Sequence, residues 1–250
     1  MQKNKLFYKY YDIIFSKKDY KKETDYILNS WYKYNQKDPI SILDFGCGTG
    51  SHTLTFADRG FEILGYDINE NMIKIANSKR TFSSEVKFIF QDILDADIEK
   101  SFDIIYSYFF VINYITDITT LEAIFKKFHS ILNHNGTFLF DIVNGEATCK
   151  YQPKIKEVNS EYKNILINGF LYPKFNSRLN SAEYHYDLTV IDNNKKIKVD
   201  YFMNQVYWSP SVLIPLLTKC GFKSIKVFKH LTDIEGGGSD DYKISLLCVK

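Results

Sequence analysis

Apolar residues in the first part of the chain alternate between short continuous runs and stretches with helical spacing. The runs have the length of strands that are buried on both faces, and they occur at 40–45, 61–66, 86–90, 102–107 and 136–143. Helical spacing marks the segments 6–15, 20–31, 51–59, 69–79 and 121–132. Strands that alternate with helices of this length predict right-handed crossovers and a parallel, Rossmann-like doubly wound α/β sheet.

The pattern changes after the fifth predicted strand. Strand-like segments follow without helices between them, at 158–170, 181–191 and 196–207, and Asp192 to Asn194 forms a hairpin between the last two. We therefore expect an antiparallel β insertion over 146–208. A helix from Ser209 to Cys220 and strands at 222–230 and 242–249 then complete a seven-stranded sheet in one domain, 1–250. The short glycine loop between these strands predicts that the last strand is antiparallel.

The first predicted strand ends in Gly46-Cys47-Gly48-Thr49-Gly50, and a helix follows. Glycines at such a turn let the backbone approach a ligand that rests against the helix start. Asp67 lies 21 residues after Gly46, at the end of the next strand, where its carboxylate can accept hydrogen bonds from both ribose hydroxyls. This layout indicates a dinucleotide or S-adenosylmethionine.

The spacing helps to choose between these ligands. A dinucleotide fingerprint requires its third glycine at position 51, which is Ser51, whereas here the glycine is Gly50. Asp44 adds a negative charge at the strand end. This charge would attract the cationic methionine portion of S-adenosylmethionine, whereas a pyrophosphate, which is itself negative, would gain nothing from it. The alternative for Asp44 is that it caps the following turn.

A third carboxylate follows the third strand, in Gln91-Asp92-Ile93. Asp92 could accept a hydrogen bond from an adenine amino group, and Ile93 could pack on the ring. Alternatively, Asp92 caps the next turn. Because Asp44, Asp67 and Asp92 all fall at carboxyl ends of neighbouring strands, the ligand-binding interpretation is favoured.

The segments Leu43–Gly50, Gly65–Asn69 with Met72, Gln91–Ile93 and Leu132–Thr137 resemble the successive motifs of class I S-adenosylmethionine-dependent methyltransferases. The resemblance implies S-adenosyl-L-methionine as cofactor and a seven-stranded sheet with the last strand antiparallel. It places the methionine portion against Gly46, Cys47, Gly48 and Gly50, the ribose on Asp67, and the adenine beside Ile68, Met72, Gln91, Asp92 and Ile93. We include Tyr108, after the fourth strand, in the predicted cofactor set.

Residues 10–20 and the insertion resemble the small-molecule branch of this family, including N-methyltransferases of amino sugars and glycine-like amines. In those relatives the N-terminal helices close over the cofactor. This implies a lid over 1–36 with Tyr11 and Tyr20 as contacts, and an acceptor wall over 146–208. The candidates for catalysis at the acceptor are Tyr114, Glu183 and His185. The alternatives are a packed aromatic for Tyr114 and, for the other two, a solvated strand face.

Composition excludes several classes. The 32 basic and 30 acidic residues are interspersed, and Ser107–Phe110 lacks the prolines found after the fourth strand in enzymes that methylate exocyclic amines of DNA bases, so no nucleic acid is expected. Cys47, Cys149, Cys220 and Cys248 are far apart, which argues against a metal site and a disulfide framework. No segment reaches the roughly 18 apolar residues of a membrane helix. We expect a soluble cytoplasmic protein, monomer or homodimer, without metal.

The leading hypothesis is a methyltransferase that transfers a methyl group to nitrogen or oxygen of a small molecule, such as an amino sugar or sugar nucleotide, mainly by proximity and orientation. One alternative is a nicotinamide-dependent oxidoreductase, against which Ser51 argues. The other is a non-catalytic partner protein that binds S-adenosylmethionine.

Overall fold

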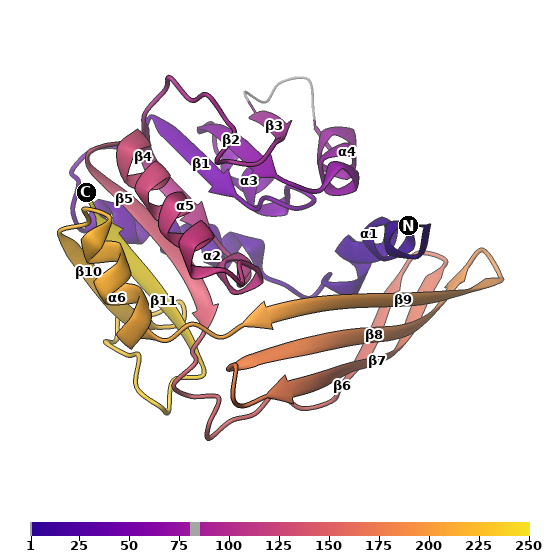
Figure 1. The fold of residues 1–250 in the computed structure, drawn as a ribbon. Coiled ribbons are helices and arrows are strands. Elements are labelled where there is room, and N and C mark those ends of the chain that lie inside the picture. The colour runs from indigo at the N-terminus through magenta and orange to yellow at the C-terminus, as the bar shows by residue number, and fades with distance from the viewer. Residues whose placement is uncertain (1, 81–85) are drawn as a thin grey trace.

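The computed structural model describes residues 2–80 and 86–250, and its centre is a seven-stranded sheet. The strand order is β10-β11-β5-β4-β1-β2-β3 (Figure 1). The strands are β1 Ser41–Phe45, β2 Glu62–Asp67, β3 Val86–Phe90, β4 Phe102–Ser107, β5 Leu132–Val143, β10 Ser224–Lys229 and β11 Lys243–Val249. Strand β11 runs antiparallel to both β5 and β10, while β1 to β5 are parallel, which confirms the predicted sheet and its reversed last strand.

Helices cover both faces of this sheet. One face carries α2 (Tyr20–Tyr32), α3 (Ser51–Ala57) and α4 (Glu70–Ser78), whose side chains pack in one core cluster with β1, β2 and β3. The other face carries α5 (Ile118–Ile131) and α6 (Pro210–Lys219), which form a second core cluster. The sheet is therefore doubly wound, as predicted.

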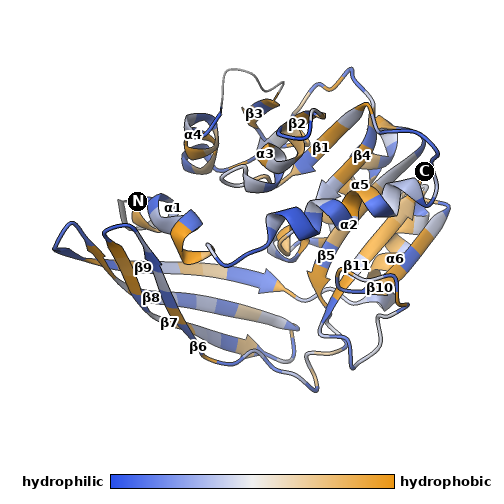
Figure 2. Cartoon of the chain, turned by 180° about the vertical axis from the view of Figure 1, so that it is seen from behind, coloured by the Kyte–Doolittle hydropathy of each residue, from blue (hydrophilic) through white to orange (hydrophobic). Residues whose placement is uncertain are grey.

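Burial on two faces explains the composition of the central strands. In Figure 2 the hydrophobic colour concentrates in the strands of the seven-stranded sheet, whereas the strands of the second sheet alternate between polar and apolar residues. Every residue of β4 is buried, and Phe138 and Phe140 of β5 are fully buried between the helix layers. A strand buried on both faces has no polar position to alternate with, which is why the central strands read as continuous apolar runs.

The insertion is a separate four-stranded antiparallel sheet, ordered β6-β7-β8-β9 (Figure 1). Its strands are β6 Lys156–Tyr162, β7 Ile165–Asn176, β8 Ser181–Asp192 and β9 Lys195–Val206. The predicted hairpin between β8 and β9 is present, with Asn193 and Asn194 at φ values of 48° and 65°. The prediction of one strand over 158–170 was wrong, because the chain turns back at Lys163, which has a φ of 52°. That turn contains no glycine or proline, and its one turn-favouring residue, Asn164, is a weaker signal than the Asp192–Asn194 run of the other hairpin.

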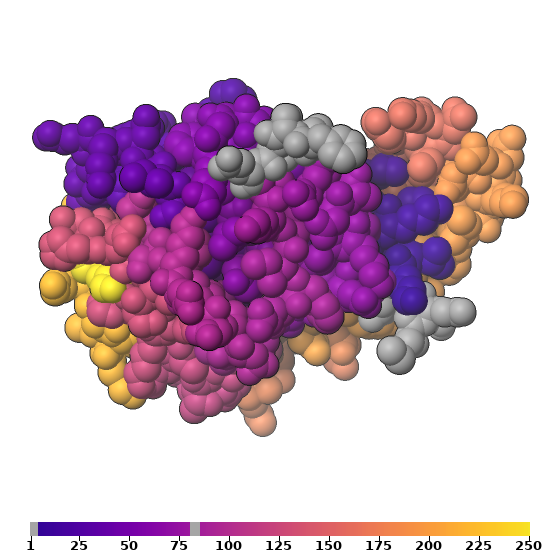
Figure 3. All heavy atoms as spheres, turned by 90° about the horizontal axis from the view of Figure 1, so that it is seen from above, coloured from indigo at the N-terminus to yellow at the C-terminus, as the bar shows by residue number. Residues whose placement is uncertain are grey.

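Helix α1 (Gln2–Ile14) lies between the two sheets. The indigo helix sits next to both units in the view from above (Figure 3). The ring of Phe7 in this helix stacks on Tyr201 of β9, with centroids 4.0 Å apart. Phe7 and Ile14 belong to one core cluster with residues of the insertion. The sequence did not predict the short helix η1 (Val111–Tyr114), which follows β4. In the described part of the chain, no helix is long and apolar enough to span a membrane.

Candidate active site

The glycine turn after β1 is fixed to the next strand by its backbone. The amides of Gly46 and Cys47 donate hydrogen bonds of 2.8 and 3.0 Å to the carbonyl of Tyr66. Gly48 has a φ of 55°, and a Cβ placed on it would meet no atom within 4 Å, because this residue borders a cavity. A Cβ on Gly46 would instead lie 2.5 Å from Val111. Gly48 therefore leaves room for a ligand, whereas Gly46 leaves room for a neighbouring side chain.

Asp67 joins this turn to the start of α4. Its Oδ2 accepts a hydrogen bond of 2.8 Å from the Gly48 amide, and its Oδ1 accepts one of 2.7 Å from the Asn69 amide. Asn69 in turn caps α4 by accepting from the amides of Asn71 and Met72. Burial raises the pKa of Asp67. The carboxylate lies in the cavity wall beside the glycine turn, and its contact with a ribose stays a prediction.

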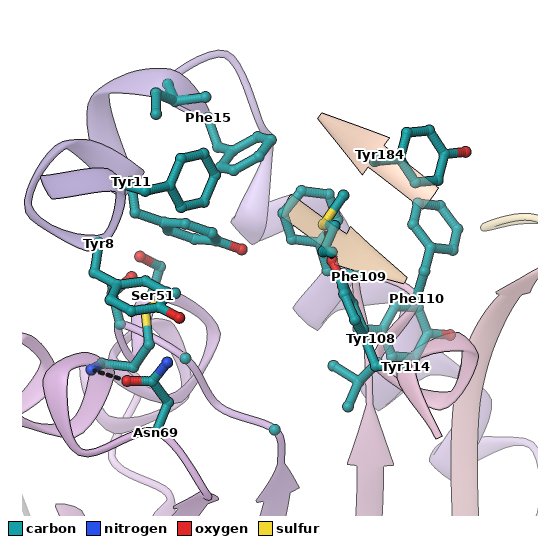
Figure 4. A pocket seen from close by; sticks show the side chains of 18 of the residues that line it. Tyr8, Tyr11, Phe15, Ser51, Asn69, Tyr108, Phe109, Phe110, Tyr114 and Tyr184 are labelled. Atoms are coloured by element: carbon teal, nitrogen blue, oxygen red, sulfur yellow. Dashed lines mark hydrogen bonds between the residues drawn. The ribbon is translucent and has the colours of Figure 1, made fainter. Parts of the chain in front are cut away.

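The cavity extends from the glycine turn to the inner face of the insertion and encloses about 750 Å³. Figure 4 shows aromatic side chains on both sides of the space, with Tyr8, Tyr11 and Phe15 of the N-terminal segment facing Phe109, Phe110 and Tyr184. Ten of the predicted cofactor residues line this cavity: Tyr11, Tyr20, Gly46, Cys47, Gly48, Asp67, Ile68, Met72, Gln91 and Tyr108.

Asp44 and Gly50 lie behind the cavity wall rather than in it. Asp44 is 2% exposed and accepts a hydrogen bond of 2.6 Å from the Thr53 hydroxyl of α3. Burial raises the pKa of this carboxyl group. Gly50 is the left-handed N-cap of α3, and a Cβ on it would lie 2.5 Å from the Phe88 ring. Both residues support the turn from outside.

Asp92 and Ile93 likewise lie outside the lining residues. Asp92 is exposed, and its Oδ1 accepts a hydrogen bond of 3.0 Å from the Leu94 amide, which is the turn-capping alternative. Ile93 is 1% exposed and packs in the core with Leu43 and Tyr66. In this structure Ile93 presents no surface to the cavity.

Strand β8 turns its aromatic face inward. Tyr184 and Tyr186 line the cavity, while Glu183 and His185 point to the opposite side of the strand. His185 stacks on Phe202 with centroids 4.1 Å apart, outside the cavity. Glu183 and His185 could act on an acceptor only if the polar face of β8 looked into the cavity. In this structure that face looks away from the cavity. The apolar face is needed to pack against α1, so the polar face is left to solvent.

Helix α2 is fastened to α3 at the edge of the cavity. Glu23 Oε2 lies 2.6 Å from His52 Nε2, and its other oxygen is paired with Lys18. Burial alone would raise the pKa of Glu23, but the hydrogen bond and charge of His52, together with Lys18, lower it to about 2. The Tyr20 ring packs edge-on against His52, with centroids 4.8 Å apart. This buried network holds the beginning of α2 beside the glycine turn.

Sequence reasoning missed part of the cavity wall. Phe109 and Phe110 line it, although the sequence drew attention to them only through the absence of proline. Lys17, Lys156 and Lys243 line it as well. Lysines scattered over three distant segments carry no local signal, and only the fold brings them to one cavity. In the described residues, no group of three or more His, Cys, Asp or Glu side chains is placed to hold a metal ion.

Comparisons with known proteins agree with this geometry. The family model described as a methyltransferase domain matches residues 36–202. A relative from Geobacillus sp. (strain WCH70) that carries a methyltransferase name is 25% identical over 90% of this chain and 90% of its own. The crystal structure of an S-adenosylmethionine-dependent methyltransferase from Clostridium acetobutylicum ATCC 824 has a TM-score of 0.82 at 20% identity and covers 98% of both chains.

A further solved structure is similar to the chain and holds the cofactor. It is an amino pentose methyltransferase from Micromonospora echinaspora with bound S-adenosylmethionine, with a TM-score of 0.73 at 15% identity, which covers 93% of this chain and 92% of that one. The open side of Gly48 and the carboxylate of Asp67 fit this group. When bound, S-adenosylmethionine supplies a methyl group on a cationic sulfur. Because the family model matches more than half of the chain, the chain belongs to the methyltransferase domain family and is a class I S-adenosylmethionine-dependent methyltransferase.

Proposed function

We propose that this enzyme methylates a small molecule, with an amine nitrogen favoured over an oxygen, and that the acceptor is of the amino-sugar or sugar-nucleotide class. The single observation that carries the proposal is the continuity of one cavity from the glycine turn to the insertion. A donor held at the turn and an acceptor held against the insertion would share this space. A cavity of about 750 Å³ suits small molecules, not a nucleic acid.

The aromatic lining supports a cationic or amine-bearing acceptor. Phe15, Phe109 and Tyr184 lie around the part of the cavity away from the glycine turn (Figure 4), and Tyr186, another lining residue, packs edge-on against Phe15. Aromatic ring faces attract cations, and methylation of an amine places positive charge on the product nitrogen. A wall of this kind can stabilise that charge without a carboxylate partner.

Three lysines support an anionic carrier on the acceptor. Lys17 follows α1, Lys156 begins β6 and Lys243 begins β11, and all three line the cavity. Burial lowers the pKa of Lys243, and the nearby positive charge of Lys156 lowers it further, so Lys156 and Lys243 repel each other. An anionic group such as a diphosphate would relieve this repulsion.

The cavity offers little for proton transfer. Among its lining residues, Asp67 and Glu157 carry a carboxylate and His52 carries an imidazole. Asp67 accepts hydrogen bonds from the amides of Gly48 and Asn69, and Nε2 of His52 is bonded to Glu23. Tyr114 is 43% exposed, towards the cavity, and its position deep in the fold raises the pKa of its phenol to about 12, so this group stays protonated near neutrality and acts as a hydrogen-bonding group rather than as a base. The chain's own residues would thus contribute by positioning the reactants.

Within the lid expected over residues 1–36, we assign the moving part to α1, because α2 packs in the core cluster of the seven-stranded sheet, and we assign residues 146–208 to the acceptor wall. Tyr8 and Tyr11 reach the cavity from α1, and Tyr20 reaches it from the start of α2. Tyr184 and Tyr201 reach it from β8 and β9. Because α1 also packs on the insertion, opening of the lid would expose both ends of the cavity together.

The test is a donor-turnover screen with the full chain, which measures S-adenosylhomocysteine release with amino sugars, nucleotide sugars, amino acids and phenols. We expect turnover with an amine on a sugar or nucleotide sugar. The variant Lys156→Ala should raise the KM for a nucleotide-linked acceptor several-fold and leave that for the free amino sugar unchanged. Lys195→Ala, on the exposed β8–β9 hairpin, is the matched control.

Two results would overturn the proposal. Turnover confined to phenols or to amino acids would contradict the acceptor class. Binding of S-adenosylhomocysteine in a calorimetric titration, without turnover of any acceptor in the screen, would contradict it as well.

A further inference from the structure

Asp141, near the carboxyl end of β5, is a buried acid that does not line the cavity. It is 1% exposed, and its Oδ1 accepts a hydrogen bond of 2.7 Å from the Phe110 amide. Its Oδ2 has no hydrogen-bond partner in the described residues. The nearest cationic candidate, Nδ1 of His230, lies 3.9 Å from Oδ2 and also lacks a partner there. A buried carboxyl group with so few partners requires an explanation.

The backbone that Asp141 binds is in an unusual conformation. Phe109 and Phe110 have φ values of 76° and 62°, two successive left-handed residues, neither of them glycine or asparagine. Such a conformation is unfavourable for aromatic residues and persists where neighbouring groups hold it. The Asp141 carboxyl group is one such holder, and Lys18 and Lys243 lie over the Phe109 and Phe110 rings at 4.2 and 5.0 Å.

The left-handed pair leads directly into the cavity wall. Phe109, Phe110, Val111 and Tyr114 all line the cavity, and Val111 occupies the space beside Gly46. A change at the pair would therefore move the contact with the glycine turn and the direction of Tyr114 together. Strained backbone conformations cluster at active sites and ligand clamps, where the surrounding structure holds them.

We propose that Asp141 is a positioning residue for methyl transfer. By accepting a hydrogen bond from the Phe110 amide it holds the left-handed Phe109–Phe110 pair, and it thereby fixes the position of the cavity wall that contains Tyr114 relative to the glycine turn. This inference rests on the proposed function, because it takes that wall as the acceptor's contact surface. Asp141 acts through Phe110 and does not touch the reactants.

The groups around Asp141 indicate that its hydrogen-bond acceptor matters more than its charge. Tyr108 and His230 face it, and Glu23, Lys18 and Lys243 lie further out. Burial raises the pKa of Asp141 to about 7, so part of the population is neutral near pH 7. A neutral carboxyl group still accepts through its carbonyl oxygen, and so does an asparagine amide of the same shape.

The experiment compares Asp141→Ala with Asp141→Asn. Asp103→Ala is the matched control, because Asp103 is another buried acid that accepts a hydrogen bond of 2.8 Å from a backbone amide, that of Ile40, but near the amino end of β4, at the other end of the parallel strands. The measurements are kcat and KM with an acceptor from the screen, calorimetric affinity for S-adenosylhomocysteine, and amide hydrogen exchange of residues 108–112. Asp141→Ser, with a shorter side chain, replaces the alanine variant if that variant does not fold.

We expect Asp141→Ala to lower kcat by about tenfold or more, because a displaced wall misaligns the reactants, and to speed exchange of the Phe110 amide by about tenfold or more. Asp141→Asn and Asp103→Ala should keep kcat, Phe110 exchange and the affinity for S-adenosylhomocysteine within about threefold of the wild type. Equal losses in Asp141→Asn and Asp141→Ala, or in Asp103→Ala, would overturn the inference.

The two proposals fail in different ways. If the wild type turns over no acceptor in the screen, the proposed acceptor class is wrong, while Phe110 exchange still shows whether Asp141 holds the pair. If turnover is normal and Phe110 exchange does not respond to Asp141→Ala, the positioning role is wrong and the proposed function stands.

Discussion

Asp12 of α1 accepts a hydrogen bond of 2.5 Å from the hydroxyl of Thr49 in the glycine turn. Its other oxygen accepts one of 2.8 Å from Lys79, just after α4. The N-terminal helix is thus tied to the turn on one side, while its aromatic residues pack on the insertion on the other. This arrangement makes α1 the element that connects the predicted donor end of the cavity to the predicted acceptor end.

Removal of this tie should weaken binding of S-adenosylhomocysteine. Asp12→Ala loses two hydrogen bonds at a half-exposed position, one from the Thr49 hydroxyl and one from the Lys79 ammonium. We therefore expect the dissociation constant of S-adenosylhomocysteine, measured by calorimetry, to rise roughly three- to tenfold. Asp25→Ala is the control, since Asp25 pairs with Lys21 and Arg59 away from the cavity. Equal affinities of the Asp12 variant and the wild type would show that α1 does not stabilise the bound state.

Gly48 and Gly60 provide a matched pair for the glycine turn. Both have positive φ values, 55° and 85°, and a Cβ on either would meet no atom within 4 Å, but only Gly48 borders the cavity. Alanine at each position should cost about 1 kcal/mol of unfolding free energy through backbone strain. Gly48→Ala should in addition reduce affinity for S-adenosylhomocysteine by at least about tenfold, through steric overlap with the ligand. Similar affinities of the two variants would mean that the ligand does not approach Gly48.

Tyr114 should affect turnover rather than cofactor binding. Its hydroxyl lies 3.1 Å from the sulfur of Met203 and borders the cavity on the side of the insertion. We expect Tyr114→Phe to lower kcat about three- to tenfold through loss of one hydrogen bond to the acceptor, and to leave the S-adenosylhomocysteine affinity nearly unchanged. Tyr172→Phe, on the outer side of the insertion, should change neither quantity. Equal losses in turnover and affinity would assign Tyr114 to the cofactor end of the cavity.

The sequence predicted the seven-stranded sheet because its central strands are buried on both faces and its glycine turn has a local signature. It did not decide which face of β8 looks inward. An alternating strand defines two faces, and only the apolar side of α1, packed against Tyr186 and Leu188, selects between them.

The left-handed Phe109–Phe110 pair could not be predicted either. Aromatic residues do not favour this conformation, and the group that holds it, Asp141, is 31 residues away from Phe110 in the sequence. Tertiary contacts of this kind leave no local pattern. Sequence motifs therefore predict most of the residues at the predicted donor end of the cavity, while the residues that line the opposite end are brought together by contacts between distant segments.

Asp141 should make the stability of the protein depend on pH. Its pKa is about 7 in the folded protein against an ordinary value of 3.8, so the folded state binds a proton that the unfolded chain has released. Stability should accordingly fall as pH rises from about 4 to about 7, and stay level with respect to this group above that range. Burial is the main cause, because the ionised carboxylate must be kept away from water with only one hydrogen bond.

Asp141→Asn removes this titration while it retains an acceptor for the Phe110 amide. We expect its unfolding free energy, measured with urea, to approach that of the wild type near pH 4 and to exceed it by a few kcal/mol at about pH 8. His230, whose pKa burial lowers to about 4, is present in both proteins together with Lys18, Lys243 and Glu23, so their contributions largely cancel in the difference. A difference that stays constant between about pH 5 and 8 would show that Asp141 is already ionised across this range, and that the hydrogen bond from Phe110, with the cations beyond it, offsets the burial of the charge.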